Sequence, residues 1–173
     1  MNTRYSLVCA AVATLMASSA SAHVTLESRQ ATIGAGYKAV LAVPHGCAGS
    51  ATTKIRVQIP EGVIAVKPMP KAGWTIEVIK GKYAAEYDFH GTKFSEGVKE
   101  VVWSGGKLPD DFYDEFVIST FLTGVLKPDT VLYFPTVQEC EQGVSRWIDI
   151  PADAAHARDT KWPAPGVKLN AKP

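Results

Sequence analysis

The sequence predicts an all-β sandwich in a single domain, and three observations carry that prediction. From Tyr37 onward, short apolar runs rich in β-branched residues alternate in part with polar residues. Segments rich in Gly, Pro and Asp separate these runs. Helical periodicity is scarce, apart from one short turn expected in "PADAAHARD". This pattern is typical of two sheets that bury their alternating inner faces against each other.

The expected strands follow one another along the chain and are separated by turn signals. Pro44 cannot donate a hydrogen bond to a neighbouring strand, so it ends the first run, "YKAVLAV". "PEG" follows the second run, "KGKY" the third and "GGKLPDD" the fourth, while "LKPD" and "EQG" precede the last two. The expected strands are residues 37–43, 52–59, 74–79, 100–104, 113–122, 130–137 and 145–150. Residues 153–173 are Pro-rich and are expected to form a loosely held tail outside a sandwich of residues 23–152.

Residues 1–22 have the features of a secretory signal peptide. Arg4 supplies a positive start, an apolar run follows, and the small residues Ala20, Ser21 and Ala22 form an A-x-A cleavage site. The apolar run is shorter than the roughly 20 residues that a membrane-spanning helix needs. We therefore expect cleavage before His23. The product would be a periplasmic or secreted protein that meets a membrane only through its signal peptide.

Charge and cysteine content limit the partners and the compartment. Removing Arg4 with the signal peptide leaves 17 basic and 17 acidic residues. Nucleic acids and anionic membrane surfaces need clustered basic charge, so neither is expected as a partner. The mature chain keeps Cys47 and Cys140. In an oxidising compartment such a pair favours a disulfide, and the alternative is a pair of thiolate ligands for a soft metal.

Cleavage before His23 would place three potential metal ligands on one residue: the α-amine, a ring nitrogen and the next peptide nitrogen. The ordinary pKa of an α-amine is about 7.7 to 8.0, so a metal displaces its proton readily. Amine and imidazole nitrogens suit Cu(II). The alternative is that His23 is an ordinary residue near the start of a strand.

Two further side chains are candidate ligands. His45 lies in the turn "VPHGCAGS", where its alternative role is that of an exposed loop histidine. A bridge from Cys47 to Cys140 would make this turn rigid, as a preformed site requires. Glu27 shares one face of an extended "HVTLES" with His23, and it either completes the site or is solvated.

Residue patterns that indicate an enzyme are missing from the sequence. There is no G-x-S-x-G, no Cys with a placed His and no Gly-rich phosphate loop. Adjacent acids in "YDEF" and "LPDD" face opposite ways on a strand, so they imply no shared acid and base. Trp103 and Trp147 lie in expected strands, where an aromatic side chain is usually part of the core. We therefore expect no catalytic residue.

Four blocks of sequence, in order, cover nearly the whole mature chain. They are "AHVTLE" at its start, "VPHGCAGSATTKIRVQIPEGVIAVKPMPKAGW" at residues 43–74, "VVWSGGKLPDDFYDEF" at 101–116 and "FPTVQECEQGVSRWIDIP" at 134–151. Together they resemble the YcnI-like family of exported copper-associated proteins. The resemblance implies an immunoglobulin-like β-sandwich that binds Cu(II) through its N-terminal histidine, an acidic residue and a nearby tryptophan.

Carried over to this chain, the histidine of that family is His23 and the tryptophan is Trp147. The family's glutamate follows a "VP" pair, and this chain has His45 and Gly46 there. Either His45 replaces the carboxylate or Glu27 supplies the oxygen ligand.

The first hypothesis for function is a Cu(II)-binding protein that holds, buffers or transfers copper without catalysis. Its expected partners are the copper ion and other periplasmic copper chaperones or an inner-membrane copper transporter. The second is a copper-dependent oxidative enzyme, because an N-terminal histidine with a second histidine is also the ligand set of copper monooxygenases. The third is an adhesion or assembly sandwich without a metal.

Overall fold

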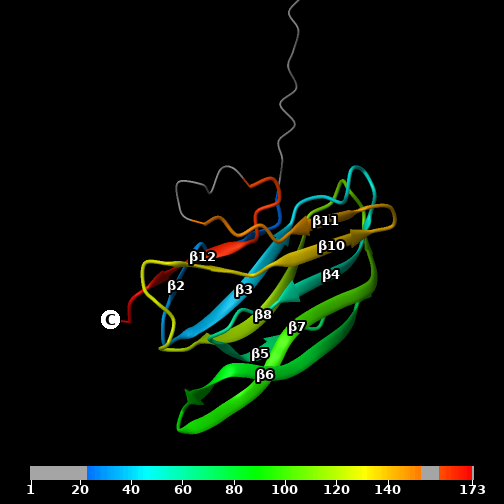
Figure 1. Ribbon diagram of the computed structural model, residues 1–173. Helices are drawn as coiled ribbons and strands as arrows, with labels where there is room; N and C mark the ends of the chain where they lie inside the picture. Colours follow the sequence, from blue (N-terminus) through cyan, green and yellow to red (C-terminus); the bar gives the residue numbers. More distant parts are fainter. Residues whose placement is uncertain (1–22, 153–159, 173) are drawn as a thin grey trace, which may run out of the picture.

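Three sheets make up the structure, a computed structural model that describes residues 23–152 and 160–172. The four-stranded sheet has the order β1 (Thr25–Leu26), β3 (Gly36–Val43), β8 (Asp114–Leu122) and β5 (Val63–Pro68). The five-stranded sheet has the order β11 (Val144–Trp147), β10 (Thr136–Cys140), β4 (Thr52–Gln58), β7 (Thr92–Leu108) and β6 (Thr75–Phe89). A small third sheet joins β2 (Gln30–Thr32), β12 (Gly166–Asn170) and β9 (Val131–Tyr133) (Figure 1). The described part of the chain has no helix, and therefore none that could cross a membrane.

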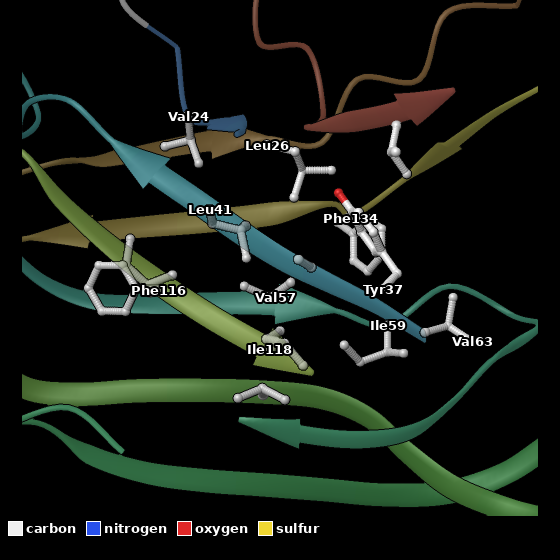
Figure 2. Close-up of a cluster of buried hydrophobic side chains, with 14 of the residues drawn as sticks. Val24, Leu26, Tyr37, Leu41, Val57, Ile59, Val63, Phe116, Ile118 and Phe134 are labelled. Atoms are coloured by element: carbon white, nitrogen blue, oxygen red, sulfur yellow. The ribbon is translucent and has the colours of Figure 1, made fainter. Parts of the chain in front are cut away.

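The two larger sheets contribute side chains to one hydrophobic core. Ile55 and Val57 of β4 point inward from the five-stranded sheet, and Phe116 and Ile118 of β8 from the four-stranded sheet (Figure 2 shows Val57, Phe116 and Ile118). All four are fully buried, and burial of an apolar side chain of this size is worth about 1.5 to 3 kcal/mol. Trp103 is also fully buried, so its expected place in the core is confirmed. The all-β sandwich predicted from the alternation is therefore correct.

The hairpin of β6 and β7 is much longer than the sequence predicts. The segment "KGKY", residues 80–83, was expected to be a turn, and that expectation is wrong because β6 continues through it as far as Phe89. Gly81 pairs with Gly97 across the hairpin, and the register shifts on both sides of this pair. The turn lies instead at His90 and Gly91, whose φ angles of 53° and 81° both fall in the left-handed region that a two-residue hairpin turn requires.

Several short or irregular strands also differ from the expected pattern. β5 was not predicted, since it is six residues long, contains Ala65 at a φ of 52° and ends in a proline. The expected strand 130–137 divides into β9 and β10, because the chain passes at Phe134 and Pro135 from the small third sheet to the five-stranded sheet. Neither β1 nor β2 exceeds three residues, so both strands are too short to show an alternation of apolar and polar residues.

The C-terminal segment was expected to be a loosely held tail, and for residues 160–172 that expectation is wrong. β12 pairs in parallel with β2 and antiparallel with β9. Its inward residues Val167 and Leu169 are fully buried and belong to the same core. The Pro-rich composition concealed a short alternating strand, "GVKLN", so the sandwich extends beyond residue 152. The expected signal peptide and residues 153–159 of the expected short turn lie outside the described residues.

Candidate functional site

His23 precedes β1, and strand pairing brings it to the turn that carries His45. In the antiparallel pairing of β1 with β3, Thr25 lies opposite Ala42 and Leu26 opposite Leu41. Continuing this register toward the N-terminus places His23 opposite Pro44, directly beside His45 in sequence. The two candidate histidines thus meet at one corner of the four-stranded sheet.

The ring of His45 is held by its own turn. Its Nδ1 lies 2.5 Å from the carbonyl oxygen of Gly46, and since a carbonyl only accepts, Nδ1 carries the proton. In the neutral ring Nε2 is then the nitrogen with a lone pair. Histidines that bind metals usually donate their second ring N–H to a carbonyl or carboxylate in this way. The geometry therefore suits His45 as a ligand through Nε2.

Both imidazoles contact one buried indole, that of Trp147 at the end of β11. The ring centroid of His23 lies 5.2 Å from that of Trp147, with an interplanar angle of 81°. The corresponding values for His45 are 6.5 Å and 72°. Trp147 is only 2% exposed, because residues alternate inward and outward along β11 and its position faces inward. The structure thus brings together three residues that the sequence singled out.

Gln138 of β10 lies beneath this cluster and is fully buried. Its side-chain Oε1 accepts a hydrogen bond of 3.0 Å from Trp147 Nε1. Its Nε2 donates to the carbonyl oxygen of His45 at 2.6 Å and to Thr52 Oγ1 at 2.7 Å. One amide therefore touches both the indole and the backbone of the His45 turn.

A disulfide joins Cys47 to Cys140, with a Cα–Cα distance of 5.9 Å. The predicted bridge is confirmed, and the alternative of two thiolate ligands does not apply to this oxidised form. Cys47 follows His45 by two residues, and Cys140 follows Gln138 by two. The bridge therefore ties the His45 turn to β10, which pairs with the strand that carries Trp147.

Trp162, from the C-terminal segment, completes the aromatic surroundings. Its ring centroid lies 4.9 Å from that of Trp147 at an angle of 66°. Its backbone is fixed by Asp149, whose carboxylate accepts a hydrogen bond of 2.9 Å from Trp162 N. Residues 163–166 of the same segment, with His23 and Arg29, line a pocket of about 300 Å³. His23 thus lies at the wall of an open depression.

Glu27 directly follows β1. It is exposed, and its charge acts on Tyr113. The pKa of that phenol is raised to about 12, chiefly by its hydrogen bond to Glu115, then by partial burial, then by the charges of Glu115, Glu27 and Asp114. Among residues 23–152 and 160–172, no three His, Cys, Asp or Glu side chains come together closely enough to hold a metal. His45 shares with His23 the contact to Trp147, and Glu27 stays a candidate ligand.

Three residues near the site were not predicted from the sequence. Gln138 and Trp162 are described above, and the third is Asp110, whose Oδ1 accepts a hydrogen bond of 2.8 Å from the backbone N of Gly46. Asp110 was considered only as half of an acid pair in "LPDD". A buried Gln in a strand carries no local signal, and Trp162 lies in the Pro-rich segment that was expected to be a loosely held tail.

The fold defines the class of this protein as an immunoglobulin-like β-sandwich, here with an imidazole and indole cluster at its N-terminal corner. An uncharacterized protein from Nocardia farcinica, whose crystal structure reveals an immunoglobulin-like fold, is similar to it with a TM-score of 0.62. The alignment covers 86% of this chain and 98% of the other, at 23% sequence identity. This likeness shows the fold alone.

The family follows from the sequence comparison. Residues 23–169 match the family model described as a domain of unknown function, DUF1775, and the chain belongs to this family. It is the family that the four sequence blocks indicated. The match begins at His23 and includes most of β12, in agreement with the extent of the sandwich. No curated protein matches the chain.

Proposed function

We propose that the mature protein begins at His23 and binds Cu(II) outside the cytoplasm, to hold it, buffer it or pass it on without catalysing a reaction. The observation that carries this proposal is the contact of both His23 and His45 with the buried indole of Trp147. Two imidazoles from separate segments lie beside one rigid aromatic wall. The backbone nitrogen of His23 would become an α-amine on cleavage, which adds a third nitrogen at the same place.

The chemistry of these donors fits copper. Imidazole and amine nitrogens suit Cu(II), and an α-amine of ordinary pKa loses its proton readily to a metal. With its Nδ1 hydrogen-bonded to Gly46 O, His45 would bind the ion through Nε2. In this role copper is the cargo, which His23 and His45 would hold while Trp147 shields one side from water.

Two further findings support a site that forms on export. The family match starts at His23, the residue that signal-peptide cleavage would expose. The Cys47–Cys140 disulfide fits an oxidising compartment. Before cleavage the nitrogen of His23 is an amide, which is a far poorer ligand than an amine, so processing would itself create the site. Copper would then pass to or from other periplasmic copper chaperones or an inner-membrane copper transporter.

The test compares mature protein that begins at His23 with a version that carries one extra Gly ahead of it. Competition against a chelator of known affinity should show a Cu(II) dissociation constant at least about tenfold higher for the extended form, a difference of 1.4 kcal/mol. His45→Ala should also weaken binding and remove one nitrogen from the electron paramagnetic resonance spectrum, whereas Glu27→Gln should do neither. His90→Ala, at the β6–β7 turn, is the matched control for loss of an exposed histidine.

Equal affinity of the extended and mature forms would refute a role for the terminal amine. Absence of stoichiometric Cu(II) uptake by either form would refute the whole proposal and leave the adhesion or assembly sandwich. Production of peroxide by the copper-loaded protein with a reductant would favour the oxidative enzyme over the holding role.

A further inference from the structure

Gln138 is a polar side chain placed where an apolar one would be expected. It lies on the inward face of β10, between β4 and β11, and is 0% exposed. A buried amide without hydrogen bonds is strongly destabilising, so such a group persists only where its partners are fixed. Each polar atom of the Gln138 side chain has a hydrogen-bond partner. Its Oε1 accepts from the Trp147 indole, and its Nε2 donates to His45 O and Thr52 Oγ1.

The chemistry of the partners fixes the orientation of this amide. An indole N–H can only donate and a backbone carbonyl can only accept. The oxygen of Gln138 must therefore face Trp147, and its nitrogen must face His45. The reversed amide would set a donor against a donor at one end and an acceptor against an acceptor at the other. Neither a carboxylate nor a hydrocarbon at this position could make both contacts as the amide does.

We propose that Gln138 is the positioning residue of the copper site, which sets the indole of Trp147 and the turn of His45 relative to each other before any ion arrives. This inference rests on the proposed function and adds a residue to it. The hydrogen bond from Trp147 Nε1 fixes the rotation of the indole against which both imidazoles pack. The hydrogen bond to His45 O fixes the backbone from which that imidazole projects.

The disulfide does not duplicate this role. Cys47 and Cys140 fasten two backbone segments together, and their sulfur atoms lie near Gln138 O and Thr52 Oγ1. Gln138 is the residue whose side chain bonds to the indole N–H itself. Partners of this kind, one step removed from a metal ligand, typically change metal affinity by about 10- to 100-fold when they are lost.

The test uses Gln138→Met, which has a similar length and no amide, with Thr52→Val as the matched control. Thr52→Val removes one partner of the same Nε2 and leaves the hydrogen bonds to His45 and Trp147 in place. Gln138→Met should raise the Cu(II) dissociation constant of the mature protein about 10- to 100-fold and alter its electron paramagnetic resonance spectrum. Thr52→Val should stay within about threefold of wild type, with an unchanged spectrum.

Nuclear magnetic resonance of the metal-free protein separates this inference from the copper proposal. In Gln138→Met the indole N–H resonance of Trp147 and the imidazole resonances of His45 should move, and in Thr52→Val they should not. Unmoved resonances in Gln138→Met would overturn the positioning role whether or not copper binds. An equal loss of Cu(II) affinity in Gln138→Met and Thr52→Val would also overturn the positioning role, because the loss would then result from general destabilisation of the protein.

Wild-type protein provides a measurement that holds even if Gln138→Met fails to fold. The Trp147 indole proton and the Gln138 side-chain amide protons should exchange slowly with solvent, because all of them are buried and bonded. Rapid exchange of either would refute the arrangement. If wild-type protein binds no copper but these protons are protected and the resonances respond as expected, only the copper proposal fails.

Discussion

Replacing both Cys47 and Cys140 with Ala should lower the stability of the sandwich and loosen the His45 turn. The bridge joins residues 93 apart in the sequence. In the chain-entropy description, cross-linking a loop of that size restricts the unfolded chain by an amount worth about 4.6 kcal/mol at 25 °C. The double substitution avoids a free thiol, which a single substitution would leave. Loss of the bridge should therefore remove about 4 to 5 kcal/mol from the free energy of unfolding.

A loss of this size should also lower the melting temperature measurably. For a domain of about 150 residues, about 1 kcal/mol shifts the melting temperature by about 2 to 4 °C. The double variant should therefore melt roughly 10 to 18 °C below the oxidised wild type. Wild type kept in a thiol reductant is the matched control, and it should move in the same direction.

Urea denaturation followed by tryptophan fluorescence gives the free energy directly. A loss below about 1 kcal/mol would refute the reasoning, because the unfolded chain would then gain little freedom from removal of the bridge. The dependence of the free energy on urea should become steeper in the variant, since its unfolded state exposes more surface. Faster hydrogen exchange of the backbone N–H groups at positions 46 and 47, without faster exchange at β8, would show that the turn loosens locally.

Two further predictions concern the core. Burial raises the pKa of the Tyr37 phenol to about 12. Between pH 10 and 12 the folded chain therefore keeps a proton that the unfolded chain releases. As the pH rises through this range, the free energy of unfolding should fall by about 2 to 3 kcal/mol. Urea denaturation across this pH range should show a smaller decrease in the free energy of unfolding for Tyr37→Phe than for wild type. The variant should also lose about 1 kcal/mol at every pH, because the hydrogen bond to Ser28 O is missing. A decrease as large as in wild type would show that Tyr37 is not the group responsible. Leu169→Ala should reduce the free energy of unfolding by about 2 to 5 kcal/mol, whereas the exposed Lys168→Ala should change it by less than about 0.5 kcal/mol. Equally small effects would mean that β12 is indeed a loose tail.

The strands predicted well are those whose boundaries depend on local chemistry. β3 ends where Pro44 removes a donor, and β4 alternates cleanly around Ile55 and Val57. The strands missed depend on distant partners. β6 passes through Gly81 because β7 pairs with it there, and β12 is held by β2, which lies far away in the sequence. No local pattern carries that information.

The residues of the candidate site also differ in whether local chemistry or distant partners determine their role. His23 and the pair Cys47 and Cys140 were singled out by the chemistry expected of an exported chain, while His45 and Trp147 gained weight from the resemblance to a family. Gln138 could not be found this way, because its importance arises from its position between Trp147 and the His45 turn. Glu27 and His45 were indistinguishable in the sequence. In the structure the ring of His45 packs against Trp147, and the charge of Glu27 acts on Tyr113.

The two ends of the described chain meet in the finished molecule, with β12 beside β2. Trp162, which precedes β12, packs against Trp147. A polypeptide made from its N-terminus carries His23 and His45 long before it carries Trp162. Contacts between such distant segments also form late and slowly in folding. A nascent or prematurely terminated chain therefore has both histidines without the complete aromatic wall. Under the proposed function, the order of synthesis itself would delay selective ion capture until the last strand is in place.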